Sequence, residues 1–238
     1  MQKLVITGLF LLFYGQVFSQ LQISDAEVIL QSRHVWRGEK LGTAPAIEPS
    51  VTLSVNRFSF NIWTSVTTNN SYSEIDLVPA FQFNKFRLTL FDYYNPVSGE
   101  NNQYLNFRPG KNRHSVELTI DNYSVKNSRF KWMAGTFLLG DKNSETGRPF
   151  YSAYLEFIYP FTLWIIDAEP FAGLTPFKGY YANTTAIINS GISFSKEVAL
   201  TSRFTIPINV TYTYNPYQDK QMVTLSTGLV FSSGKQSR

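Results

Sequence analysis

The sequence predicts an all-β protein, a single antiparallel transmembrane β-barrel of about twelve strands with both termini on the periplasmic side. Three observations carry this prediction. From residue 21 onward, apolar and polar residues alternate in short segments with almost no helical periodicity. Tight turns alternate with long polar loops along the chain. Aromatic residues on the apolar faces gather near both ends of the strands, and aliphatic residues fill the middles, as two membrane interfaces require.

Residues 1–19 differ from the rest of the chain. A positive charge at Lys3 precedes an apolar run over residues 4–14, and a small-residue pattern follows at residues 17–19. These are the three regions of a secretory signal peptide. The apolar run is too short for a membrane-spanning helix, and no later segment approaches ~18 consecutive apolar residues. We therefore expect an exported chain in which residues 20–238 form the barrel domain.

The composition limits the classes of function. The chain is 16% charged and 16% aromatic, whereas soluble domains average about 25% charged residues. A net charge of +4 without a dense basic stripe argues against nucleic-acid binding. The chain has no cysteine, which excludes disulfides and thiol chemistry. An exported protein with few charges and many aromatic residues fits a lipid environment.

The twelve expected strands follow one another with a hairpin rhythm. Tight turns join strands at Asn56-Arg57 and Asn84-Lys85, and long loops such as residues 95–112 lie on the other side. Pro49, Pro79, Pro170 and Pro207 fall inside expected strands, where a closed barrel has no free edge for a missing N–H and where bulges could absorb them. The expected strands are 23–37, 46–56, 57–67, 73–84, 85–95, 112–122, 128–140, 149–160, 162–174, 183–196, 200–214 and 219–232.

The polar faces of these strands would line the lumen. Their charged residues form either a salt-bridged plug or a constriction that selects solutes, and the sequence leaves both open. The candidate lumen and selectivity residues are Arg33, Arg37, Glu48, Glu74, Asp76, Arg87, Glu117, Glu156, Asp167 and Glu169. By strand parity, Arg33 and Arg37 are expected to meet Glu48, Glu74 and Asp76 at similar height.

The apolar faces would meet lipid, with anchoring side chains at the two interfaces. The expected interface anchors are His34, Trp36, Trp132, Trp164, Tyr212 and Tyr214. Asp92 shares the parity of Leu88 and Leu90, so either its carboxylate lies outside the barrel near the outer interface or a local bulge corrects its orientation.

Catalysis has little support in the sequence. A Ser-His-carboxylate site needs a histidine against a serine and an acid, but His34 and His114 both fall on the apolar face. A lipid-facing site with Ser32 beside His34 is the remaining variant of this hypothesis. No metal-ligand spacing and no cofactor motif is present, so we expect no metal, no cofactor and no enzyme activity.

One stretch resembles a known family. The similar segments are Val35-Trp36-Arg37-Gly38, the following Pro45-Ala46 and the acidic segment at residues 73–81. Through them the chain resembles a bacterial family of unassigned function, whose members are described as outer-membrane β-barrels with an aromatic-Val-Trp-Arg-Gly motif in the first strand. His34 stands where that family usually has tyrosine. The resemblance covers about the first third of the mature chain and implies a fold and an outer-membrane location, but no substrate.

Three functions follow from these expectations. The first is a channel or transporter for small polar solutes, with outer-membrane lipid as its surroundings. The second is a non-conducting structural or interaction barrel that contacts a partner through the long loop at residues 95–112. The third is an interfacial hydrolase built on His34 or His114. The solute, the partner and the oligomeric state do not follow from the sequence.

Overall fold

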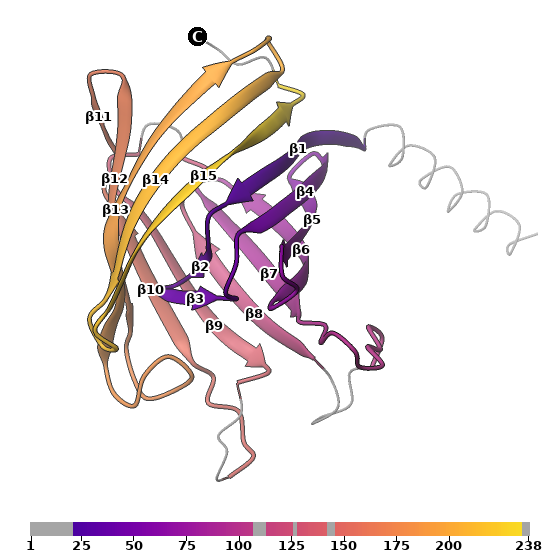
Figure 1. The fold of residues 1–238 in the computed structure, drawn as a ribbon, viewed down its shortest axis with the longest axis vertical. Helices are drawn as coiled ribbons and strands as arrows, with labels where there is room; N and C mark the ends of the chain where they lie inside the picture. Colours follow the sequence, from indigo (N-terminus) through magenta and orange to yellow (C-terminus); the bar gives the residue numbers. More distant parts are fainter. Residues whose placement is uncertain (1–20, 107–112, 126–127, 142–145, 235–238) are drawn as a thin grey trace, which may run out of the picture.

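The computed structural model describes residues 21–106, 113–125, 128–141 and 146–234 (Figure 1). The expected signal peptide, residues 1–19, lies outside these ranges. Within the described residues, twelve antiparallel strands close into a barrel, which confirms the predicted fold class. The same part of the chain contains no helix long and apolar enough to cross a membrane.

Each wall strand pairs with its neighbours in the chain, and β1 pairs with β15 to close the barrel. The short β11 (Phe161–Leu163) follows β10 after Pro160, and both strands pair with β12. The wall strands are β1 (Gln22–Gln31), β4 (Ala46–Val55), β5 (Phe58–Thr67), β6 (Ser73–Phe83), β7 (Phe86–Tyr94), β8 (His114–Asp121), β9 (Lys131–Leu139), β10 (Ala153–Ile158), β12 (Ile166–Thr175), β13 (Ala186–Ala199), β14 (Phe204–Asn215) and β15 (Lys220–Ser232).

The tight turns and both ends of the wall lie at one end of the barrel. Asn56 and Asn84 adopt left-handed conformations in the turns that join β4 to β5 and β6 to β7. Asp25 near the start of β1 pairs with Ser232 at the end of β15, so the chain enters and leaves the wall at this same end. The long loops occupy the opposite end (Figure 1).

The four strand prolines remain in the wall because the pairing is interrupted beside each of them. The register skips two pairs next to Pro49 on the β5 side, next to Pro79 on the β7 side and next to Pro207 on the β15 side. Pro170 faces the break between β10 and β11. Each missing proline N–H therefore falls where the ladder is already open on one side.

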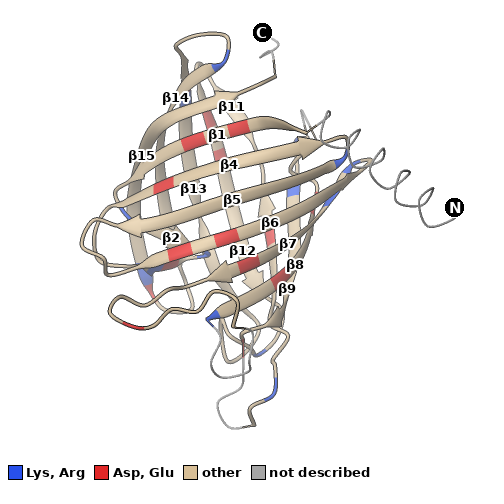
Figure 2. Ribbon diagram, turned by 90° about the vertical axis from the view of Figure 1, so that its right-hand side faces the viewer, with Lys and Arg blue, Asp and Glu red and all other residues tan. Residues whose placement is uncertain are grey.

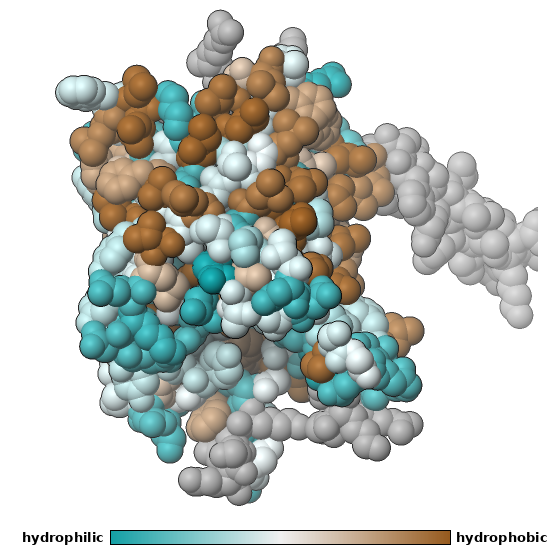
Figure 3. Space-filling model, viewed as in Figure 1, coloured by the Kyte–Doolittle hydropathy of each residue, from teal (hydrophilic) through white to brown (hydrophobic). Residues whose placement is uncertain are grey.

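The outer surface is apolar. Val28, Leu30 and Ile47 are about half exposed on it, and hydrophobic residues gather over the half of the barrel nearer the tight turns, whereas hydrophilic residues cover the loop end (Figure 3). Aromatic pairs lie near the tight turns, among them Phe86 against Trp132 at 5.8 Å and Phe204 against Phe231 at 5.4 Å between ring centroids. This is the exterior of a transmembrane barrel.

The first strand is shorter than the sequence predicted. The expected strand 23–37 is wrong beyond Gln31, where β1 ends. The chain then turns into the barrel and forms a two-stranded hairpin, β2 (His34–Trp36) and β3 (Glu39–Leu41), before it returns to the wall at β4. This hairpin, residues 34–41, lies between the walls of the barrel (Figure 1).

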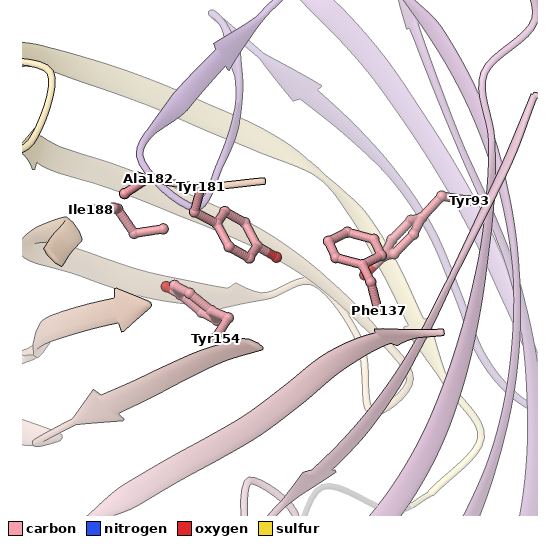
Figure 4. Packing of buried hydrophobic residues seen from close by; sticks show 6 residues of the cluster. All are labelled: Tyr93, Phe137, Tyr154, Tyr181, Ala182 and Ile188. Atoms are coloured by element: carbon pink, nitrogen blue, oxygen red, sulfur yellow. The ribbon is translucent and has the colours of Figure 1, made fainter. Parts of the chain in front are cut away.

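The largest buried hydrophobic cluster lies inside the lumen beside this hairpin. Tyr93 and Phe137 approach from one side, and Tyr154 and Tyr181 from the other (Figure 4). Trp36 of the hairpin packs against this cluster. The barrel is therefore filled at this level by side chains.

Candidate functional site

The hairpin turns on two residues with left-handed backbone conformations, Arg37 at φ 47° and Gly38 at φ 78°. Two consecutive positive φ values define a type I′ turn, which matches the twist of a two-residue hairpin. Gly38 also lies against the wall, because a Cβ atom there would come within 2.0 Å of the Ile188 carbonyl oxygen on β13. The turn is thus docked tightly on the far side of the lumen.

The Arg37 side chain is held by a carboxylate and by aromatic rings. Its two terminal nitrogens donate to the two oxygens of Glu117 at 2.8 and 2.9 Å, a bidentate ion pair. Arg37 also donates to the Tyr181 hydroxyl, and its guanidinium lies 4.2 Å from the centre of the Tyr154 ring. Tyr93 donates to Glu117 at 2.8 Å, and Glu117 is fully buried. The hairpin is thereby tied to β8 across the lumen.

His34 ties the base of the hairpin to the neighbouring wall. Its Nδ1 lies 2.8 Å from a carboxylate oxygen of Glu48, and its Nε2 lies 3.8 Å from Glu74. The ring lies parallel to Tyr72, with centroids 5.6 Å apart. His34 is 6% exposed. Together with Arg37, it fixes both ends of β2 inside the barrel.

Two sequence predictions about this stretch are wrong. His34 and Trp36 are not interface anchors, because the chain leaves the wall after Gln31 and both side chains are packed inside the lumen. The predicted contact of Arg37 with Glu48 and Glu74 is wrong as well. Arg37 pairs with Glu117 instead, and His34 contacts Glu48 and Glu74. Arg33 lies in the bend before the hairpin rather than on a wall strand.

The other candidate lumen residues lie on wall strands, and Figure 2 shows acidic residues within several of these strands. Several of them already have partners. Arg87 forms an ion pair with Asp121 at 3.1 Å, and Glu169 forms one with Lys131 at 2.8 Å. Asp167 accepts a hydrogen bond from Thr162 at 2.8 Å. Glu156 accepts hydrogen bonds from Tyr123 and Tyr154. The inner-face candidates are Glu48, Glu74, Asp76, Arg87, Glu117, Glu156, Asp167 and Glu169.

The hairpin divides the lumen into two cavities. An outer cavity of about 160 Å³ is lined by residues that include Leu41 and Tyr180. An inner cavity of about 630 Å³ extends toward the tight-turn end. Trp36, Glu74 and Tyr93 line both cavities, so they stand at the partition between them.

The aromatic side chains that fill the lumen are part of the candidate site and were not among the residues predicted for it. Trp63, Tyr93 and Tyr154 occupy polar-face positions of their strands, where attention to charge passed over them. Their inward parity was a readable signal, because aromatic rings on the polar face of a barrel strand can only fill the lumen.

A second polar cluster lies on the outer face of the wall near the loops. Asp92 faces outward, as predicted, and His114 Nδ1 lies 2.7 Å from its carboxylate. The loop after β7 folds over this pair: Tyr104 donates to Asp92 at 3.2 Å, and its carbonyl oxygen lies 2.5 Å from His114 Nε2. Burial and the adjacent Asp92 raise the pKa of Tyr104 to about 12, so the phenol stays neutral and donates.

We expect the substitution His114→Ala to release this loop, because it removes the ring that contacts both Asp92 and the Tyr104 carbonyl. Chymotrypsin added to the folded protein should then cleave after Tyr104 or Leu105 about ten times faster, since cleavage follows the open population. Tyr104→Phe, which loses one hydrogen bond and keeps the ring, should lie in between. Equal cleavage of wild type and His114→Ala would contradict the role of His114.

The remaining expected anchors lie outside the lumen. Trp132 contacts Phe86, and Trp164 is fully exposed in the turn between β11 and β12. Tyr212 and Tyr214 face outward on β14, where they donate to Gln221 and Asp219. Their role as anchors at a membrane interface stays a prediction.

The fold and this site define a class of protein: a closed transmembrane β-barrel with a hairpin folded into its lumen. No family model and no curated protein sequence matches the chain. The family suspected from the Val35–Gly38 motif therefore stays a prediction.

Solved structures with a similar fold include two outer-membrane proteins. The outer membrane phospholipase A from Escherichia coli is 12% identical, with a TM-score of 0.44 and coverage of 91% of this chain and 96% of that one. An outer membrane channel from Pseudomonas putida F1 is 12% identical, with a TM-score of 0.42 and coverage of 87% and 94%. A third structure, from work on the in-meso crystallization of membrane proteins, is 9% identical, with a TM-score of 0.48 and coverage of 89% and 84%.

Proposed function

We propose that this protein is a gated transport barrel of the bacterial outer membrane, which carries small polar solutes and which the hairpin of residues 34–41 closes. The observation that supports this proposal is the partition: Trp36 of the hairpin lines both lumen cavities. A polar lumen that one short segment divides needs only that segment to move for a path to open.

The location rests on the apolar exterior and on the signal peptide expected at residues 1–19. A barrel with this exterior needs lipid around it, and export by a signal peptide brings a bacterial barrel to the outer membrane. The tight-turn end would then face the periplasm and the long loops the outside.

Conductance in planar bilayers tests the proposal. Wild-type protein should show small, brief openings, whereas a variant with residues 33–42 replaced by a Gly/Ser segment of equal length should conduct steadily, about ten-fold more. Replacement of residues 97–103 by a similar segment is the control, because that loop lies outside the lumen and should leave conductance low. Heat-dependent migration in gels verifies that each variant is folded.

Two results would overturn the proposal in different ways. Steady wild-type conductance equal to that of the hairpin variant would show that the hairpin closes nothing. A folded hairpin variant without conductance or solute flux would remove the transport function and leave a structural barrel.

The second candidate function is a non-conducting interaction barrel. It is favoured by the loop after β7, which is held on the wall by His114 while its Leu105 is 84% exposed. An apolar side chain on an anchored loop suits contact with a partner protein. Residues 107–112 of the expected contact loop lie outside the described residues.

We also propose that the protein is not an enzyme. His34 contacts carboxylates inside the lumen, away from lipid, and the two ring nitrogens of His114 lie at hydrogen-bond distance from Asp92 and from the Tyr104 carbonyl oxygen. A Ser-His-carboxylate site would need one ring nitrogen to face a serine. Lipase or protease activity that His34→Ala and His114→Ala both abolish would overturn this.

A further inference from the structure

The inner cavity has the size and lining of a small-molecule site. Its volume of about 630 Å³ falls in the range of pockets that enclose small organic ligands. Its walls combine aromatic side chains with a few polar groups: Trp63 and Phe91 stand beside Asn61, Thr89 and Asp76. Such a lining can recognise both the shape and the charge of a ligand.

The charges that line this cavity leave an excess of negative charge. Its two arginines are already neutralised, Arg37 by Glu117 and Arg87 by Asp121. Among the described residues, the donors to Glu156 are neutral groups, two tyrosines and an asparagine amide. Glu74 accepts one from Tyr72 and has the His34 ring 3.8 Å away. The field in the cavity therefore favours a cation.

Among the described residues that line the inner cavity, Asp76 is a carboxylate with an unsatisfied buried oxygen. It is 6% exposed, and its Oδ1 is buried with no hydrogen-bond donor among the described residues. A buried carboxylate in this position is stabilised only by a proton or by a cation that enters from the cavity. Asp76 lines the cavity, so the second route is open.

Aromatic rings flank this carboxylate on both sides. Trp63 on β5 and Tyr93 on β7 are the direct cross-strand partners of Asp76, so the three side chains form a row on the inner wall. Phe91 stacks on Tyr93, with ring centroids 5.4 Å apart and planes 9° apart. A carboxylate between aromatic faces is the arrangement that attracts an organic ammonium group.

We propose that the inner cavity is a binding site for small organic ammonium cations, with Asp76 as the counter-ion and Trp63, Tyr93 and Phe91 as the aromatic walls. As a substrate class for the transport barrel, this inference rests on the proposed function. The site itself is tested by equilibrium binding to the closed barrel in detergent, which needs no conductance.

Choline is a suitable probe, measured by calorimetry and by quenching of tryptophan fluorescence. Wild-type protein should bind it saturably and should bind its neutral isostere 3,3-dimethylbutanol about ten-fold more weakly. Asp76→Asn should weaken choline binding by about ten-fold and leave binding of the neutral isostere unchanged. Asp167→Asn makes the same chemical change on the inner wall outside the cavity lining, so its affinity for choline should equal that of wild type.

A second variant addresses the aromatic wall. Trp63→Leu should weaken choline binding, whereas Trp63→Phe, which keeps a ring face, should retain most of it. Choline binding that is undetectable in wild type, equal in Asp76→Asn, or matched by the neutral isostere would overturn the site. None of these results bears on whether the hairpin gates the lumen, which conductance decides.

Discussion

The substitution Arg37→Met is expected to destabilise the barrel by about 3–5 kcal/mol, the cost of removing one partner from a buried ion pair. Glu117 is fully buried, and among the described residues its carboxylate keeps the hydrogen bond from Tyr93 after the substitution but no cationic partner. Unfolding in urea, followed by tryptophan fluorescence, measures the loss. We expect the same variant to raise conductance, because the hairpin loses its link to β8.

Two controls separate the buried pair from a general effect of lost charge. The double variant Arg37→Met, Glu117→Gln should recover part of the loss, because it leaves no uncompensated charge. Arg113→Met breaks the exposed pair with Glu100 and should cost at most about 1 kcal/mol. A loss for Arg37→Met as small as that for Arg113→Met would show that the pair does not hold the hairpin.

Gly38→Ala is expected to displace the hairpin and to destabilise the protein by at least about 2 kcal/mol, since backbone strain and overpacking each cost about 1–3 kcal/mol. The added Cβ would lie 2.0 Å from the Ile188 carbonyl oxygen, which is a backbone atom and can move away only if the β13 backbone shifts with it. Urea unfolding and bilayer conductance should both change.

Gly99→Ala is the matched control for this variant. Gly99 has φ 79°, against 78° for Gly38, but beyond its chain neighbours no heavy atom of the described residues lies within 4 Å of the position of its added Cβ. It therefore carries the same conformational strain without the clash. If Gly38→Ala were no less stable than Gly99→Ala, the close approach of the hairpin to β13 would be irrelevant to stability.

The barrel itself was predictable because its determinants are local. Side chains alternate with a period of two, so Glu48, Glu74 and Glu117 could be assigned to the inner face from neighbouring residues alone. The tight turns at Asn56 and Asn84 were readable for the same reason, since asparagine tolerates the left-handed conformation that they adopt.

The hairpin was missed because the alternation at His34 and Trp36 continues that of β1 after the strand has ended. What folds this segment inward is distant in sequence: Glu117, Tyr181 and Ile188. One local signal existed, the Arg37-Gly38 pair between two short segments, which fits a two-residue turn. The partner strands across the lumen could not be read from that signal.

The position of the hairpin in the chain has a consequence for assembly. It lies between the first two wall strands, yet its contacts reach 80 residues forward to Glu117, 144 to Tyr181 and 177 from Gly38 to Asn215. Contacts over such separations form after local pairing, because the intervening chain must first be ordered. We therefore expect the early strands to pair before the hairpin docks, and the hairpin to dock only after β8, β13 and β14 are in place. A barrel assembled in this order passes through an open state before it is sealed.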